Sequence, residues 1–93
     1  MDYKIVHRPE KRRFETEEEC VIAYVDYQVK GNSFDIVHTK VPKPLEGRGV
    51  GTSLVRSAYQ YAIDNGLKRE ATCPFASIWL KRHPEYDNED LFD

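Results

Sequence analysis

A glycine-rich turn directly before an amphipathic helix pattern constrains this chain more than any other feature. Gly47, Gly49 and Gly51 alternate with other residues in the segment 46–51. Because glycine has no Cβ, such a segment bends tightly and brings consecutive backbone N–H groups close to an anion. The unpaired N–H groups of the following helical turn add partial positive charge, so phosphate is the expected ligand. A turn without a ligand is the competing interpretation of the glycines alone.

The patterns on either side of this turn predict a strand–loop–helix–strand unit. An extended pattern over 34–41 precedes the turn, and a short returning strand over 67–73 follows the helix. The helix begins after Gly51 and ends at Asn65-Gly66, a typical left-handed cap. Its predicted apolar face consists of Leu54, Val55, Ala58, Tyr61 and Ala62. Ligand sites favour the strand-to-helix junction of such a unit.

Weaker patterns predict the remaining elements. Alternation over 21–29 indicates a half-buried strand, which a hairpin at 30–33 joins to the strand over 34–41. A short first strand is expected over 3–7, followed by a basic turn at 11–13. Pro42 and Pro44 remove two backbone donors, so the sheet is expected to open there.

A second, shorter amphipathic helix is expected over 75–82, closed by His83-Pro84. The acidic tail after it carries Tyr86, Leu91 and Phe92, which are candidates for docking it on the domain.

Length and charge limit the classes of function. The chain has 93 residues, which predicts one domain over 1–93. A net charge of −2 gives no general attraction to nucleic acid or membranes. No apolar run is long enough for a membrane span and no signal-peptide core precedes the domain, so a cytoplasmic protein is expected. Cys20, Cys73 and the scattered histidines form no metal-ligand spacing or disulfide framework, so free thiols and no metal are expected.

Two familiar phosphate loops do not fit the turn. A Walker A loop ends in Gly-Lys-Ser/Thr, whereas Thr52-Ser53 follows Gly51 here. A dinucleotide-binding fingerprint needs a third glycine at position 52 or 54, and Thr52 and Leu54 occupy these positions.

The remaining pattern resembles motif A of the GCN5-related N-acetyltransferases, Gln/Arg-x-x-Gly-x-Gly/Ala between a strand and a helix. Glu46 stands where this family usually has Gln or Arg. A sub-group of very small members is similar at four separated segments. These are His38-Thr39-x-Val41-Pro42, Gly47-Arg48-Gly49-Val50-Gly51, Cys73-Pro74-Phe75 and Arg82-His83-Pro84-Glu85-Tyr86.

The resemblance implies an α/β (α+β) fold, a mostly antiparallel sheet splayed at a βαβ unit that binds coenzyme A, with two helices. It implies an acetyl-coenzyme A-dependent N-acetyltransferase, a monomer or weak dimer, that acts on a small-molecule or protein amine. A non-catalytic module that binds or senses acyl-coenzyme A is the alternative, and an interaction domain without cofactor is a third. The expected cofactor-binding residues are Thr39, Val41, Gly47, Arg48, Gly49, Val50, Gly51 and Thr52.

Cys73 and His38 are the candidate catalytic residues. Cys73 ends the returning strand before a helix, a position that favours a thiolate able to receive an acetyl group. An inert buried cysteine is the alternative. His38 shares the alternation of Phe34 and Ile36 and is expected to face the packed side, either as a general base or as a core histidine. Larger relatives often use a tyrosine on the last helix as general acid, and Ser77 and Trp79 replace it here.

Overall fold

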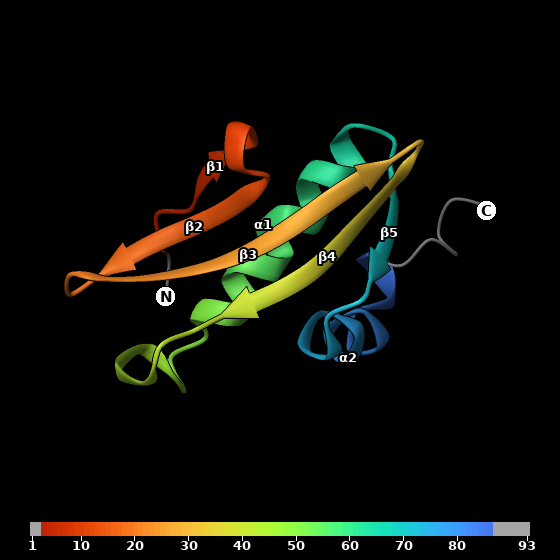
Figure 1. Cartoon of the computed structure of the whole chain (residues 1–93). Helices are drawn as coiled ribbons and strands as arrows, with labels where there is room; N and C mark the ends of the chain where they lie inside the picture. The colour runs from red at the N-terminus through yellow and green to blue at the C-terminus, as the bar shows by residue number, and fades with distance from the viewer. Residues whose placement is uncertain (1–2, 87–93) are drawn as a thin grey trace.

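Residues 3–86 fold into one five-stranded sheet with two α-helices. The structure, a computed structural model, describes residues 3–86. The strands lie in sequence order, β1-β2-β3-β4-β5, and all neighbours are antiparallel except β4 and β5, which are parallel (Figure 1). The elements are β1 (Val6–Arg8), β2 (Arg13–Glu18), β3 (Val21–Lys30), β4 (Ser33–Lys40), α1 (Val50–Asp64), β5 (Lys68–Ala71) and α2 (Pro74–Arg82), with 3-10 turns at Pro9–Lys11, Lys43–Leu45 and Pro84–Tyr86. The predicted α+β class and the parallel β4–α1–β5 unit are confirmed.

The N-terminal part of the sheet differs from the prediction because it contains an additional strand, β2. Phe14 and Thr16 are buried in β2 and alternate with charged residues, as expected for a strand with one packed face. Arg13, predicted as part of a turn, is instead the first residue of β2. The first strand also begins later than predicted, at Val6 rather than Tyr3.

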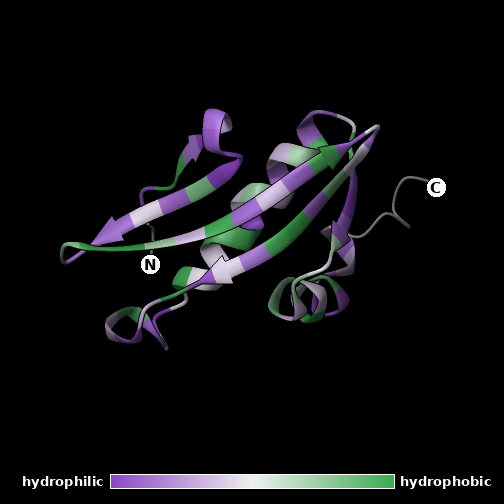
Figure 2. Ribbon diagram, in the orientation of Figure 1, coloured by the Kyte–Doolittle hydropathy of each residue, from purple (hydrophilic) through white to green (hydrophobic). Residues whose placement is uncertain are grey.

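Helix α1 covers one face of the sheet, and within residues 3–86 the opposite face carries no helix (Figure 1). The alternating hydropathy along β3 and β4 matches this one-sided packing (Figure 2). Tyr59, missed by the apolar pattern, is fully buried in α1, whereas Tyr61 is only partly buried. The helix ends as predicted, because Asn65 caps it and Gly66 adopts φ +69°.

The sheet splits between β4 and β5 just after Ile36, earlier in the chain than Pro42, where the split was predicted. β5 pairs with β4 only as far as Ile36 opposite Ala71. Beyond that point the N–H groups of Thr72 and Cys73 both donate to the Ile36 carbonyl, and the chain turns away into α2. The Asp35 carboxylate fixes this departure, since it accepts hydrogen bonds of 2.7 Å from both the N–H and the hydroxyl of Thr72. The last residues of β4 therefore have no partner strand on that side among the described residues.

The 3-10 turn Pro84–Tyr86 packs back against β5 and α2. The buried Arg69 donates through Nε to the Tyr86 carbonyl at 2.8 Å. The ring of Tyr86 lies 5.0 Å from that of Trp79, so its predicted docking is confirmed. Leu91 and Phe92 lie outside the described residues. Neither helix among residues 3–86 combines the length and apolar character needed to cross a membrane.

Candidate functional site

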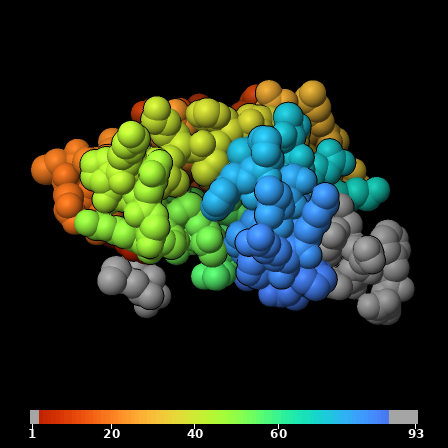
Figure 3. Space-filling view, turned by 90° about the horizontal axis from the view of Figure 1, so that it is seen from below, coloured from red at the N-terminus to blue at the C-terminus, as the bar shows by residue number. Residues whose placement is uncertain are grey.

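A hollow of about 420 Å³ lies where the sheet splits, between the end of β4 and the first turns of α1 and α2. Seen from below, the loop after β4 and the α2 side flank a recess where the start of α1 lies (Figure 3). The residues lining this hollow are Thr39, Val41, Leu45, Glu46, Gly47, Gly49, Val50, Gly51, Thr52 and Phe75. The strand end and the glycine-rich turn therefore build one wall each.

Two of the three glycines are required by backbone conformation. Gly47 has φ +78° and Gly49 has φ +79°, values that side chains with a Cβ rarely adopt. Gly49 is also the N-cap of α1 and provides no side-chain oxygen, so no side chain caps the helix. The N–H groups of the first turn consequently remain available to an anion in the hollow.

The third glycine has a different role from the predicted one. Gly51 has no left-handed backbone angle, and a Cβ built on it would lie 3.0 Å from the Phe75 ring and 3.3 Å from Val41. The missing side chain thus leaves room for an aromatic ring as well as exposing backbone. Phe75 belongs to one of the four matching segments, but periodicity along the chain gives no signal that it rests on α1.

The charged residues of the turn point in different directions. Glu46 lines the hollow, whereas Arg48 does not, so this part of the cofactor-binding prediction is not matched by the geometry. The Arg48 guanidinium instead donates to Glu19 at the tip of the β2–β3 hairpin, 2.7 Å away, and this hydrogen bond raises the pKa of Arg48. The hydroxyl of Tyr3 donates to the Arg48 carbonyl at 2.7 Å. The turn is therefore held from its outer side.

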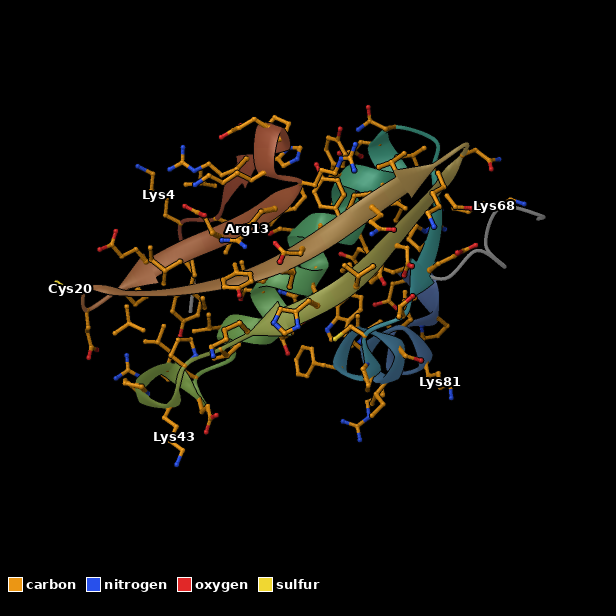
Figure 4. The ribbon with its side chains drawn as sticks, in the orientation of Figure 1. Lys4, Arg13, Cys20, Lys43, Lys68 and Lys81 are labelled. Atoms are coloured by element: carbon orange, nitrogen blue, oxygen red, sulfur yellow. The ribbon has the colours of Figure 1, made fainter. Side chains whose placement is uncertain are left out.

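Cys73 lies at the closed end of the split. It is the N-cap of α2, is 7% exposed, and its thiol donates to the Thr39 hydroxyl at 3.4 Å. Thr39 lines the hollow, so this contact connects the predicted nucleophile to the predicted cofactor-binding strand. Cys20 is exposed at the hairpin tip far from this point, and both thiols are free as predicted (Figure 4).

The predicted orientation of His38 is wrong, because β4 contains a bulge. Asp26 of β3 pairs with His38 and Tyr27 pairs with Ile36, so Val37 is an extra residue in the ladder. The bulge reverses the alternation that follows it. Thr39 therefore points to the side of Ile36, while His38 is exposed, with its ring 5.9 Å from that of Tyr24 on the uncovered face.

The structure thus brings together all but one of the predicted cofactor-binding residues. Thr39, Val41, Gly47, Gly49, Val50, Gly51 and Thr52 line the hollow. Leu45 and Phe75 also line it and were not predicted. Leu45 is fully buried beneath the turn, a position that one apolar residue between charged ones does not reveal. Within residues 3–86, no three His, Cys, Asp or Glu side chains are grouped as metal ligands.

Comparison with known proteins places this architecture among described relatives. The family model of the GCN5-related N-acetyl-transferases matches residues 13–91. Protein NATD1 of Xenopus tropicalis is 27% identical over 86 residues, which cover 87% of this chain and 77% of the relative. Protein NATD1 of Homo sapiens is 32% identical over 50 residues, which cover 54% of this chain and 44% of the relative. The solution structure of a GCN5-like protein from Staphylococcus aureus superposes with a TM-score of 0.71 at 31% identity, covering 90% and 83% of the two chains.

Proposed function

The chain belongs to the GCN5-related N-acetyltransferase family, and from this premise we propose that it binds acetyl-coenzyme A in the hollow and transfers the acetyl group to an amine. One observation carries the proposal. The hollow extends from the uncapped start of α1 to Thr39, whose hydroxyl contacts the Cys73 thiol. The uncapped start of α1 suits anionic phosphates, and the end of the hollow at Thr39 and Cys73 suits a thioester.

The cofactor would lie with its pyrophosphate on the N–H groups that follow Gly49 and with its pantetheine arm along β4 toward Thr39. The glycine conformations and the unpaired edge of β4 support this direction. Glu46 opposes it, because a carboxylate in the hollow repels phosphate. Arg48 does not offset this repulsion while it is paired with Glu19.

Two routes of transfer are compatible with this placement. In the direct route, the amine nitrogen attacks the thioester carbon, the carbon–sulfur bond breaks, coenzyme A leaves as a thiolate, and a base takes the amine proton. In the covalent route, the Cys73 thiolate attacks the thioester carbon and coenzyme A leaves as a thiolate, which gives an acetyl-cysteine. The amine nitrogen then attacks the acetyl carbon, the bond to the Cys73 sulfur breaks, and a base takes the amine proton. His38 can serve as the base only for an amine that arrives from the uncovered face of the sheet, because its side chain lies there.

A binding module without turnover is the second candidate. The 7% exposure of Cys73 and the placement of His38 outside the hollow favour it, since neither group lies open to a ligand in the hollow. Incubation with acetyl-coenzyme A and a panel of small and peptide amines separates the two functions. Mass spectrometry of intact protein would show an acetyl adduct that Cys73→Ala loses and Cys20→Ala retains if the covalent route operates. Tight binding with no acetylated amine would favour the module.

The decisive test of the site is binding of coenzyme A to wild type and to Gly49→Val. We expect binding to stabilise the folded state by about 2.7 kcal/mol at a ligand concentration one hundred times Kd. The melting temperature should rise accordingly. A valine at φ +79° strains the turn by about 1–3 kcal/mol and places a side chain beside the phosphates, so binding should be lost. Glu46→Gln is the matched variant and should bind more tightly, with the gain shrinking as salt rises. Unchanged affinity in a folded Gly49→Val variant would exclude this turn from the site.

A further inference from the structure

The hollow lacks the tyrosine that larger members of the family often use to protonate the leaving thiolate. No tyrosine among residues 3–86 lines it. Ser77 and Trp79, which replace that tyrosine on the last helix, do not line it either. A positioned acid speeds such a step by about 10²–10⁴-fold. The proposed transfer therefore needs another source for this proton.

The Thr39 hydroxyl lies where that proton is needed. The bulge at Val37 turns Thr39 to the α1 side of β4, so its side chain lines the hollow. A pantetheine arm along β4 brings the thioester to this hydroxyl. The hydroxyl oxygen accepts the Cys73 thiol hydrogen at 3.4 Å, and within residues 3–86 no group accepts the hydrogen of the hydroxyl itself. That hydrogen is consequently available to a ligand.

Cys73 lies behind Thr39 rather than in the hollow. The Cys73 side chain is 7% exposed and is not among the lining residues. Its place is nevertheless fixed, because its N–H donates to the Ile36 carbonyl at 3.0 Å. The preceding residue, Thr72, is held by two hydrogen bonds to Asp35. A hydrogen-bonded chain of thiol and hydroxyl therefore leads from the buried sulfur to the hollow.

We propose that Thr39 is a catalytic residue that relays a proton from the Cys73 thiol to the departing sulfur of coenzyme A. The inference rests on the proposed function, through its direct route. As the amine nitrogen attacks and the carbon–sulfur bond breaks, the Thr39 hydroxyl gives its hydrogen to the leaving sulfur and takes the thiol hydrogen of Cys73. A base takes the amine proton. Water returns a proton to the Cys73 thiolate after the products leave.

Both ends of this relay are thiols, which makes the proton transfer energetically feasible. Moving a proton from one thiol to another changes the free energy little, because donor and acceptor are groups of the same kind. Thr39 alone could not supply the proton, since an aliphatic hydroxyl is a much weaker acid than a thiol. The relay also gives the buried Cys73 a function that requires no direct contact with the substrate.

The test measures kcat and the affinity for acetyl-coenzyme A, with ethylamine, spermidine and a lysine-bearing peptide as acceptors. Thr39→Val keeps the shape of the side chain but removes the hydroxyl, and Cys73→Ala removes the proton source. Each should lower kcat about 10²-fold and leave the affinity within about threefold. The double variant should be no slower than the slower single variant, because the two groups act as one unit.

Conservative variants separate the relay from a loss of structure. Thr39→Ser should recover most of the wild-type kcat, since it keeps the hydroxyl. Cys20→Ala should match wild type, because Cys20 is exposed at the hairpin tip. Thermal unfolding checks that each variant folds. If Cys73→Ala does not fold, Cys73→Ser supplies the same comparison with a hydroxyl that is too weak an acid to replace the thiol.

The outcomes separate the relay from the proposed function. Unchanged turnover in Thr39→Val and Cys73→Ala would overturn the relay and keep the transferase. Multiplied losses in the double variant would overturn it as well, because the two groups would then act independently. An acetyl group on wild-type Cys73, found by mass spectrometry of intact protein, would show that this thiol is the nucleophile instead. Failure of wild type to acetylate any of the three amines would overturn both the relay and the proposed transfer.

Discussion

Helix α1 supports two regions that are built in opposite ways. Toward its C-terminal half, β1, β2 and β3 form an aromatic cluster with it, which we define as His7, Phe14, Tyr27 and Tyr61. Ring centroids in this cluster lie 4.1–6.4 Å apart, and the His7 and Phe14 rings are stacked within 1° of parallel. At its N-terminal end, glycines, a bulge and the early end of β5 leave a hollow. Dense packing and an open hollow therefore lie at different ends of one helix.

The difference shows how a small domain can keep an open hollow. A short chain buries limited apolar area, so an open site must be offset by dense packing elsewhere. The aromatic cluster supplies large rings with defined contacts, whereas the hollow leaves the Phe75 ring partly exposed to solvent. Substitutions in the two regions should consequently affect different measurements.

The largest expected effect is on the packed side. Phe14 is 5% exposed and contacts His7, Tyr27 and Tyr61. Phe14→Ala should lower the free energy of unfolding by about 3–5 kcal/mol, measured by urea denaturation, because it leaves a cavity among rings. Affinity of the folded variant for coenzyme A should stay within about twofold, since distant sites behave independently.

If Phe14→Ala does not fold, Phe14→Leu supplies the same comparison at a smaller cost of about 1 kcal/mol. A parallel loss of stability and affinity in either folded variant would show that the two regions are coupled through α1.

In the open region, Gly51→Ala should weaken coenzyme A binding and leave stability nearly unchanged. The new Cβ would meet the Phe75 ring at 3.0 Å, and this half-exposed ring can move outward. Alanine also favours helix by up to about 1 kcal/mol, so stability should change little. The displaced ring should weaken coenzyme A binding about three- to tenfold by calorimetry, because Phe75 lines the hollow. A large loss of stability with unchanged affinity would contradict this division.

The sequence predicted those features that neighbouring residues determine, and it missed those that depend on contacts between distant segments. The strands β3 and β4 and both helices follow periodic patterns of neighbouring residues, and these predictions are confirmed. The run of glutamates at 17–19, at and just after the end of β2, obscures the alternation of Phe14 and Thr16, so that strand was missed.

The site required information that no local pattern contains. The bulge at Val37 arises from pairing with β3, and it decides that Thr39 rather than His38 lies on the α1 side. Likewise, only the packing of α2 on α1 reveals that Gly51 accommodates Phe75. The glycine-rich turn was predictable because its chemistry lies within consecutive residues.

The smallest expected effect is a pH dependence that belongs to the packed side. Burial lowers the pKa of His7 below its ordinary value of 6.5, an effect that nearby Glu10 partly opposes. The folded state therefore favours neutral His7, whose Nε2 lies 2.6 Å from the Tyr27 hydroxyl, while the unfolded chain takes up a proton near pH 6.5. Since the unfolded state then binds more protons, stability should fall as pH drops below 6.5 and level off below the folded pKa.

Urea denaturation of wild type and His7→Phe at pH 7.5 and 5.5 measures this effect. The variant keeps an aromatic ring on Phe14 but cannot titrate, so its loss of stability between the two pH values should be smaller than that of wild type. His38→Gln is the matched control, because it removes an exposed histidine of the open region and should leave the wild-type difference unchanged. Equal pH dependence in wild type and His7→Phe would mean that other groups titrate in this range, and that the aromatic cluster contributes to stability through packing alone.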